Sequence, residues 1–283
     1  MRVLVIGGGY IGQNFAQYAS SRCVNEDIAF AVDVVDARIG WKNTHFENYD
    51  AVLFAAGIAH RKQTRQNKHL YYEVNRDLAI AVAKKAKTAH VRQFVYLSSM
   101  SVYGKQQGEI TAHTMPCPRD NDYYGHSKFQ AEEALKKIAA ENFKITVVRP
   151  PMVYGLNCPG KFSQLLRLSK FMPIVPDTQN KRSMIYIDNL SDFLYMIIKN
   201  EMSGIFCPQN KTYINTAHLI RKIRQKQGKK TATSLVLGAI VHAILPFCPP
   251  LKNAFGSLYY VHLPSFANQN IDYLCIADAE EEY

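Results

Sequence analysis

Near the N-terminus, a short apolar run is followed directly by three closely spaced glycines. The run is Val3–Ile6, the glycines are Gly7, Gly9 and Gly12, and a helix-like segment, Ile11–Ser21, comes next. In such a turn the first glycine permits the tight bend, the second lets the backbone approach a pyrophosphate, and the third lets the helix lie close to the strand. Free N–H groups at the helix start favour phosphate. The sequence therefore predicts a strand–turn–helix unit that binds a dinucleotide.

Short apolar runs alternate with helix-like segments through the first half of the chain. Mostly apolar strands between helices are typical of a parallel sheet covered on both faces. We expect a doubly wound α/β domain (a Rossmann fold) over residues 1–150. A smaller, less regular substrate-binding lobe is expected over residues 151–283, with a strand exchanged back into the first sheet as an option. The later predicted strands are Ile28–Val35, Ala51–Phe54, Gln93–Leu97 and Ile145–Val148, and the later predicted helices are Glu73–Thr88 and Tyr123–Ala140.

Composition limits the classes of partner and compartment. The net charge of +11 suits an anionic small molecule, but the basic residues are spread out without interleaved aromatic residues, so we expect no nucleic acid. The six cysteines form no C-x-x-C pair and the nine histidines form no ligand cluster, so we expect neither disulfides nor a metal site. Reduced thiols, and a first strand that leaves no room for a signal peptide, predict a cytoplasmic protein.

The longest apolar stretch, Leu235–Pro246, is too short to span a bilayer. We therefore predict no membrane span and interpret the stretch as a buried helix or strand. Basic residues precede it, which keeps contact with a membrane surface as an alternative. These residues are Arg221, Lys222, Arg224, Lys226, Lys229 and Lys230.

A carboxylate some 20 residues after the glycine turn is expected to bind the adenosine ribose of the dinucleotide. Asp33 and Asp36 both lie in this region. Asp36 is slightly favoured because it ends the apolar run and precedes Ala37 and Arg38. Arg38 can instead meet a ribose phosphate, so the sequence predicts NAD and leaves NADP open.

Three polar residues form a candidate reaction centre. Ser99 follows a predicted strand, and Tyr124 and Lys128 stand four residues apart on a predicted helix, so they share one helix face. A tyrosine phenol titrates near ~10, and a neighbouring ammonium favours the phenolate and brings it into range as an acid/base. A serine hydroxyl can orient the substrate alcohol. Tyr-x-x-x-Lys alone is common on solvated helices, but the upstream segment Ser98–Gly104 favours the catalytic interpretation.

Six segments extend this pattern. They are residues 7–12, YDAVLFAAGIAH at 49–60, FVYLSSMSVYG at 94–104, YGHSK at 124–128, VRPPMVYG at 148–155 and RSMIYIDNL at 182–190. Their order and spacing resemble the extended short-chain dehydrogenases/reductases of the NAD-dependent epimerase/dehydratase family. The chain looks most similar to bacterial nucleotide-sugar 4-epimerases and 4-keto reductases of surface-polysaccharide pathways.

This resemblance implies roles for individual residues. Ser99, Tyr124 and Lys128 are implied as the catalytic residues. Ser99 and Tyr124 are also implied to contact the substrate, and Arg182 resembles an arginine that grips the nucleotide diphosphate. The implied cofactor-binding positions are Gly7, Gly9, Tyr10, Ile11, Gly12, Asp33, Asp36, Ala55, Ala56, Gly57, Asn75, Ser98, Tyr124, Lys128 and Pro150.

The resemblance also implies a reaction. The expected enzyme is an NAD-dependent epimerase acting at carbon 4 of a UDP-hexose, of the UDP-glucose 4-epimerase type, through a 4-keto intermediate. An NAD(P)H-dependent 4-keto reductase of a nucleotide sugar is the alternative, and a catalytically inactive dinucleotide-sensing protein is an alternative of another class. A dehydratase is disfavoured because Met100 and Ser101 occupy the places of its acidic pair. Relatives are often dimers through the helix that carries Tyr124 and Lys128, so we expect a homodimer.

Overall fold

The computed structural model describes residues 1–26, 29–59 and 61–261, and the chain divides into two compact units. Each unit is assembled from separate stretches of chain. Unit 1 comprises Met1–Gly104, Pro116–Pro150 and Ile187–Pro208, and unit 2 comprises Lys105–Met115, Pro151–Tyr186 and Gln209–Tyr283.

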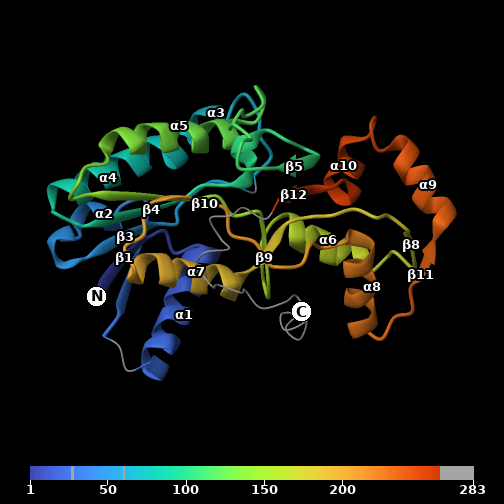
Figure 1. The fold of residues 1–283 in the computed structure, drawn as a ribbon, viewed down its shortest axis with the longest axis horizontal. Coiled ribbons are helices and arrows are strands. Elements are labelled where there is room, and N and C mark those ends of the chain that lie inside the picture. The colour runs from blue at the N-terminus through green and yellow to red at the C-terminus, as the bar shows by residue number, and fades with distance from the viewer. Residues whose placement is uncertain (27–28, 60, 262–283) are drawn as a thin grey trace. The chain divides into compact units, whose positions relative to one another are not determined.

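A six-stranded parallel sheet forms the centre of unit 1 (Figure 1). Its strand order is β10-β6-β4-β3-β1-β2, and all five neighbouring pairs are parallel. This arrangement confirms the expected doubly wound α/β fold, with the chain reversing its direction of travel between β1 and β3. The strands are β1 (Arg2–Ile6), β2 (Ala31–Val35), β3 (Ala51–Phe54), β4 (Gln93–Leu97), β6 (Lys144–Val148) and β10 (Gly204–Phe206).

Helices cover both faces of this sheet. In Figure 1, α4 and α5 lie above the sheet and α1 and α7 lie below it. Because both faces are covered, β3 and β4 are buried along their whole length. The helices are α1 (Tyr10–Glu26), α2 (Gly40–Asn43), α3 (Lys68–Tyr72), α4 (Leu78–Thr88), α5 (Tyr123–Ile138) and α7 (Ile187–Lys199), with short helical turns η1 (Phe46–Asn48), η2 (Glu73–Asp77, a π-helical turn) and η3 (Met100–Tyr103).

One core cluster of unit 1 fills the space between the sheet and helices α4 and α5. Helix α4 presents Ala79, Val82, Ala83 and Ala86, which are fully buried in one cluster with the sheet residues. Alanine side chains let a helix lie close to a sheet, and the spacing of three and four residues keeps them on one face. Burial of such apolar area supplies most of the stability of a domain.

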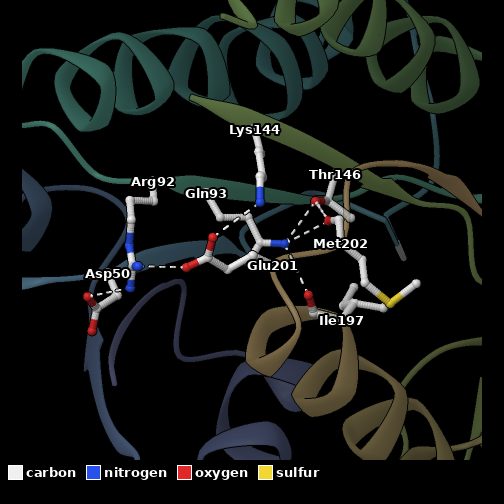
Figure 2. Close-up of polar contacts among 8 residues, drawn as sticks. All are labelled: Asp50, Arg92, Gln93, Lys144, Thr146, Ile197, Glu201 and Met202. Atoms are coloured by element: carbon white, nitrogen blue, oxygen red, sulfur yellow. Dashed lines mark hydrogen bonds and ion pairs between the residues drawn. The ribbon is translucent and has the colours of Figure 1, made fainter. Parts of the chain in front are cut away.

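The edge strand β10 comes from the second half of the chain, together with α7, which packs on α1. Gln93, fully buried at the amino end of β4, holds this returning segment. Its Nε2 donates to Thr146 Oγ1 at 3.1 Å and to the carbonyls of Ile197 at 3.1 Å and Met202 at 2.8 Å (Figure 2). One amide therefore ties β4 and β6 to the end of α7.

An ionic network lies beside this amide. Figure 2 shows Glu201 between two cations: its carboxylate is 2.9 Å from Arg92 and 3.2 Å from Lys144. Arg92 also pairs with Asp50 at 2.9 Å. Glu201 has a φ of +46°, an unfavourable region for a residue with a side chain, and these contacts fix it there. The amino ends of the strands thus carry a network that secures the fold.

The described residues of unit 2 form three two-stranded parallel pairs and four helices. The pairs are β5 (Gly108–Ile110) with β12 (Leu258–Tyr260), β7 (Met152–Tyr154) with β9 (Met184–Tyr186), and β8 (Ile174–Pro176) with β11 (Ala232–Ser234). The helices are α6 (Lys161–Ser169), α8 (Thr216–Lys226), α9 (Leu235–Ile244) and α10 (Pro249–Phe255). A small core of Val175, Ala217, Ile220, Val241 and Phe255 joins β8 to α8, α9 and α10.

The apolar stretch at 235–246 forms α9, but the prediction that it is buried is wrong. Only Gly238 and Val241 of this helix are buried. The helix packs one face on β8 and α10, and nothing described covers its other face. Apolar composition indicates burial only where a second layer is present. Among the described residues, no helix is long and apolar enough to cross a membrane.

Candidate active site

The glycine turn joins β1 to α1 as the sequence predicts. Gly7 has a φ of +108°, and a Cβ there would lie 2.7 Å from the backbone nitrogen of Ala56, so only glycine fits. A Cβ on Gly12 would lie 2.1 Å from the carbonyl oxygen of Gly7, which shows how closely α1 approaches the turn. A Cβ on Gly9 would meet nothing within 4 Å. The open backbone at Gly9, followed by the first turn of α1 at Tyr10 and Ile11, fits a pyrophosphate.

The two candidate ribose ligands have different surroundings. Asp33 lies inside β2, and its Oδ2 already accepts hydrogen bonds from Arg2 and from the Tyr49 hydroxyl, each at 2.9 Å. Asp36 lies beyond the end of β2, at the sheet edge that also carries the glycine turn, since Gly7 N–H donates to Val35 O at 2.9 Å. Its Oδ1 accepts the N–H of Arg38 at 2.7 Å. This placement favours Asp36 as the residue that faces a dinucleotide.

The side chain of Asn75 forms hydrogen bonds that hold the loop after β3 in place. This side chain is fully buried in the π-helical turn η2, a kind of turn found often at functional sites. Its Oδ1 accepts the N–H of Ile58 at 2.8 Å, and its Nδ2 donates to Ser127 Oγ at 3.0 Å on α5. A Cβ on Gly57 would lie 3.2 Å from both Asn75 Oδ1 and Lys128 Nζ. The structure thus brings the segment Ala55–Gly57 against Asn75 and Lys128.

Ser98 and Ser99 follow β4 but point to different partners. Ser98 is buried, and its hydroxyl donates to the Glu132 carboxylate on α5. Ser99 is partly exposed, has extended backbone, and caps η3, its Oγ accepting the N–H of Ser101 at 3.1 Å. Met100 N–H donates to the Pro150 carbonyl at 3.0 Å, so the end of β6 fixes the same loop. Of the two serines, Ser99 is the one that remains accessible.

Tyr124 meets Ser99. A hydrogen bond from the Ser99 side chain acts to lower the pKa of Tyr124, but burial of the phenol is the larger effect and raises that pKa. Asp122 adds to the rise. The predicted lowering of this pKa by Lys128 is not seen, because the lysine directs its ammonium elsewhere. Burial therefore disfavours the phenolate in these surroundings.

Lys128 is almost fully buried one turn beyond Tyr124. Its Nζ donates to the Leu97 carbonyl at 2.6 Å and lies 4.7 Å from the centre of the Tyr96 ring. Burial lowers the pKa of Lys128 to about 7, and the negative charge of Glu132 partly opposes that shift. A lysine with such a pKa changes its charge in the physiological range, which is typical of functional sites.

A buried ion pair behind Lys128 was not anticipated from the sequence. Glu132 is fully buried on α5 and pairs with Arg149, which follows β6. The Nε of Arg149 lies 3.1 Å from Oε1 and 3.2 Å from Oε2 of Glu132. Arg149 also donates to the Tyr103 hydroxyl at 2.8 Å. Together with Ser98, this pair connects β4, β6, η3 and α5 around the candidate catalytic groups. The spacing of four residues from Lys128 to Glu132 was a usable signal, but nothing local identifies Arg149 as its partner.

The start of α5 is fixed by two further residues that the sequence did not single out. Asp122 caps the helix, its Oδ1 accepting the N–H of Gly125 at 3.1 Å. Gln63 donates to the same oxygen at 3.0 Å and accepts the backbone N–H of Tyr124 at 3.1 Å. These bonds hold the first turn, which carries Tyr124, in one position.

Arg182 lies in unit 2. Its NH1 donates to the Gly256 carbonyl at 2.9 Å, and its backbone bridges to Ile214 and Leu258. Burial lowers the pKa of this guanidinium. Within the described residues it forms no ion pair with a carboxylate.

The chain is similar to members of one enzyme family. The sequence model of the NAD dependent epimerase/dehydratase family matches residues 3–206, which include the glycine turn and the Ser99, Tyr124 and Lys128 positions. A UDP-glucose 4-epimerase of Vibrio cholerae is 30% identical over 250 residues, covering 82% of this chain and 72% of that protein.

Two further proteins are similar. An N-acetyl-alpha-D-glucosaminyl-diphospho-ditrans,octacis-undecaprenol 4-epimerase of Escherichia coli O157:H7 is 29% identical over 195 residues, which is 64% of this chain and 56% of that protein. The solved structure of a UDP-glucuronic acid 4-epimerase from Bacillus cereus in complex with NAD aligns over 100% of this chain and 97% of that chain, with a TM-score of 0.71 at 17% identity. At that identity the structural likeness shows the shared fold.

Proposed function

Because the chain belongs to the NAD-dependent epimerase/dehydratase family, we propose that it inverts carbon 4 of a UDP-linked hexose through a 4-keto intermediate. The chain is an NAD-dependent enzyme, and the family includes both epimerases and reductases of nucleotide sugars. The contact between Ser99 and Tyr124, with Lys128 one turn further on, carries the proposal. This set is what the removal and return of a hydride at a secondary alcohol requires.

Tyr124 would exchange the proton of the substrate hydroxyl. As C4 is oxidised, the C4–H bond would break, its hydrogen would leave as hydride with the bonding electron pair, and the hydroxyl proton would pass to the oxygen of Tyr124 in its phenolate form. Bound NAD supplies the acceptor, and later the donor, of that hydride. Ser99 would hold the same hydroxyl by a hydrogen bond and stabilise negative charge on the oxygen. Hydride return to the opposite face of the keto carbon, with the proton returned by Tyr124, gives the epimer.

Lys128 and the ion pair behind it would position the phenol. The Lys128 ammonium lies against the segment Ala55–Gly57, which we propose lines the cofactor together with Gly9 and Asp36. When charged, Lys128 would favour the phenolate that the oxidation step requires, against the burial that raises the pKa of Tyr124. Glu132 and Arg149 would act through Lys128 and Ser98, as positioning residues rather than catalytic ones.

Unit 2 would bind the nucleotide part of the substrate. We propose that Arg182 contacts the diphosphate, because a guanidinium offers paired donors that match phosphate oxygens. The absence of a carboxylate partner among the described residues supports this role. Arg182→Lys keeps the charge and removes the fork, so it should raise KM for the sugar nucleotide more than it weakens NAD binding.

The reaction is tested by incubating the purified protein with UDP-glucose and with UDP-GlcNAc, and separating the products by chromatography. An epimerase converts each accepted sugar to its C4 epimer with no added reductant. Tyr124→Phe serves as the control because it keeps the ring and removes the proton carrier. Conversion by the wild type and not by the variant supports the proposal.

The 4-keto reductase is the alternative outcome of the same assay. A reductase consumes added NADH or NADPH with the 4-keto sugar nucleotide and leaves UDP-glucose unchanged. Consumption of the reductant in proportion to product would replace the epimerase proposal with that activity. No turnover of any of these substrates would contradict both.

A further inference from the structure

Helix α9 and the turn after it present large apolar side chains to the surface of unit 2. Leu235, Val236 and Phe247 are 76%, 72% and 83% exposed, and Ile240 and Ile244 are also exposed. Val236, Ile240 and Ile244 are spaced four residues apart, so they share one face of the helix. Contiguous apolar patches on a protein surface usually mark an interaction site.

The exposed face belongs to a firmly seated helix. Ser234 caps the start of α9 by accepting the N–H of Leu237 at 3.1 Å. On the packed face, a Cβ on Gly238 would lie 2.3 Å from the Asp177 carbonyl oxygen, and Val241 is buried in the core of unit 2. The helix therefore approaches its support closely on one side and keeps the other side apolar and uncovered within residues 1–261.

The charge of unit 2 identifies the kind of partner. The described residues of unit 2 contain 14 lysines and arginines but only two carboxylates, those of Glu109 and Asp177. Lys229 and Lys230 are exposed and stand directly before β11, the strand that leads into α9. From Leu235 to Leu251 the sequence has no charged residue. An uncharged apolar face thus belongs to a unit whose described residues are strongly cationic.

An anionic lipid surface meets both requirements. Apolar side chains enter the boundary between headgroups and acyl chains, and the neighbouring cations attract acidic headgroups. A second copy of the chain fits less well, because self-association would bring two cationic units together. Nucleic acid shares the negative charge but offers no apolar surface for valine, isoleucine and leucine side chains.

We propose that the α9 face, defined as Leu235, Val236, Ile240, Ile244 and Phe247, docks unit 2 on membranes that contain anionic lipids. Helix α9 has 10 residues and lies on the surface of the bilayer rather than across it. Docking does not depend on the reaction, so its test is independent of the proposed function.

The proposal is tested by sedimentation of the full-length protein with vesicles of phosphatidylcholine alone and of phosphatidylcholine with phosphatidylglycerol. We expect sedimentation with the anionic vesicles, little with the neutral ones, and a decrease at high salt. Val236→Glu should lower the partition onto anionic vesicles about tenfold, because one carboxylate enters the contact.

Met115→Glu is the matched control. Met115 is 78% exposed, also lies in unit 2 and gives the same change in charge, so its variant should sediment like the wild type. Circular dichroism and NAD binding check that both variants fold. Wild type that stays in the supernatant with anionic vesicles, or equal partition of the two variants, overturns the proposal. A dimer in light scattering that Val236→Glu converts to monomer also overturns it, because the face is then a self-interface.

Discussion

Polar networks lie at both ends of the strands of the unit 1 sheet, one at the amino ends and one at the carboxyl ends. The two networks differ in how deeply their side chains are buried. At the amino ends of the strands, Arg92, Lys144 and Glu201 form ion pairs, and these side chains are between 25% and 56% exposed. At the carboxyl ends, Glu132 and Arg149 pair with almost no exposure. If one partner of an ion pair is removed at the amino ends, water can hydrogen-bond the remaining charge. If one partner is removed at the carboxyl ends, the remaining charge stays buried without a partner.

The comparison separates fold maintenance from chemistry. The polar side chains at the amino ends of the strands bond to one another and to the segment that returns through α7, so this network stabilises the sheet (Figure 2). The polar side chains at the carboxyl ends surround Ser99, Tyr124 and Lys128, where ligands bind in doubly wound folds. Substitutions in the two networks should therefore alter different measurable properties.

The largest expected effect is on turnover at the carboxyl ends of the strands. Tyr124→Phe should lower kcat by about 10²- to 10⁴-fold, because the phenol proton carrier is lost while the ring is kept. Product formation measured by chromatography, together with NAD affinity, gives the result. Near-normal kcat with unchanged NAD binding would remove Tyr124 from the proposed mechanism.

The next effect is on stability, and it compares one carboxylate from each network. Glu132→Gln should lower the free energy of unfolding by about 3–5 kcal/mol, because Arg149 is left buried without a counter-charge. Glu201→Gln, at the exposed pairs with Arg92 and Lys144, should cost about 1 kcal/mol or less and leave kcat unchanged. Urea unfolding measures both.

A double variant distinguishes the effect of an unpaired buried charge from a general failure to fold. Glu132→Gln with Arg149→Met removes both buried charges, so it should recover part of the stability lost in Glu132→Gln. Equal losses for Glu132→Gln and Glu201→Gln would contradict the difference between the two networks.

A third prediction concerns pH. Lys128 has a pKa of about 7 in the folded chain and about 10.4 when unfolded. Between these values the unfolded state binds more protons, so this lysine makes stability rise with pH, by up to about 1.4 kcal/mol per unit. Below pH 7 the lysine is charged in both states, and its desolvation cost is present in full.

The measurement is the free energy of unfolding of the wild type and of Lys128→Met at pH 7 and pH 9. Methionine keeps a similar length and does not titrate. The stability of the wild type relative to the variant should rise by about 2 kcal/mol over this range. If the free energy of unfolding changes equally with pH in the two proteins, Lys128 does not titrate between pH 7 and pH 9.

The smallest expected effect is on NAD binding. Asp36→Ala should raise the Kd for NAD about tenfold, because one hydrogen bond to a charged group is lost. Asp33→Ala should raise it less than about twofold, because that carboxylate already accepts from Arg2 and Tyr49. Calorimetric measurement of the Kd for NAD in both variants shows which of the two aspartates binds the cofactor.

Asp36→Asn distinguishes a ligand from a turn residue. Asparagine can still accept the N–H of Arg38, so it preserves the turn while removing the charge. Wild-type affinity in this variant, with loss in Asp36→Ala, would assign Asp36 to the turn alone.

Local patterns in the sequence predict the elements of unit 1 well. β3 and β4 have the bounds that their apolar runs predict, and the glycine turn lies between β1 and α1 as expected. The reason is that a strand buried on both faces must be apolar throughout, which is a local property. The serine, tyrosine and lysine positions follow from the same segments.

Features that depend on distant partners could not be predicted. The pairing of Glu132 with Arg149 joins α5 to β6, and neither residue indicates the other. The sequence analysis gives a strand exchanged back into the first sheet as an option, but β10 has three residues, with Ile205 exposed, so its sequence does not identify the returning segment. The surface position of α9 depends on which layers surround it, and its composition alone predicted the opposite.

The discontinuous construction of unit 1 affects its biosynthesis. Its sheet has β6 as an open edge until residues 204–206 have been made and β10 can pair with it. A nascent chain on the ribosome must therefore expose that edge, and the apolar face that α7 later covers, while the Pro151–Tyr186 segment of unit 2 is being translated. Synthesis of this protein should depend on chaperones that hold unpaired strand edges, and a product that ends at Pro150 should aggregate.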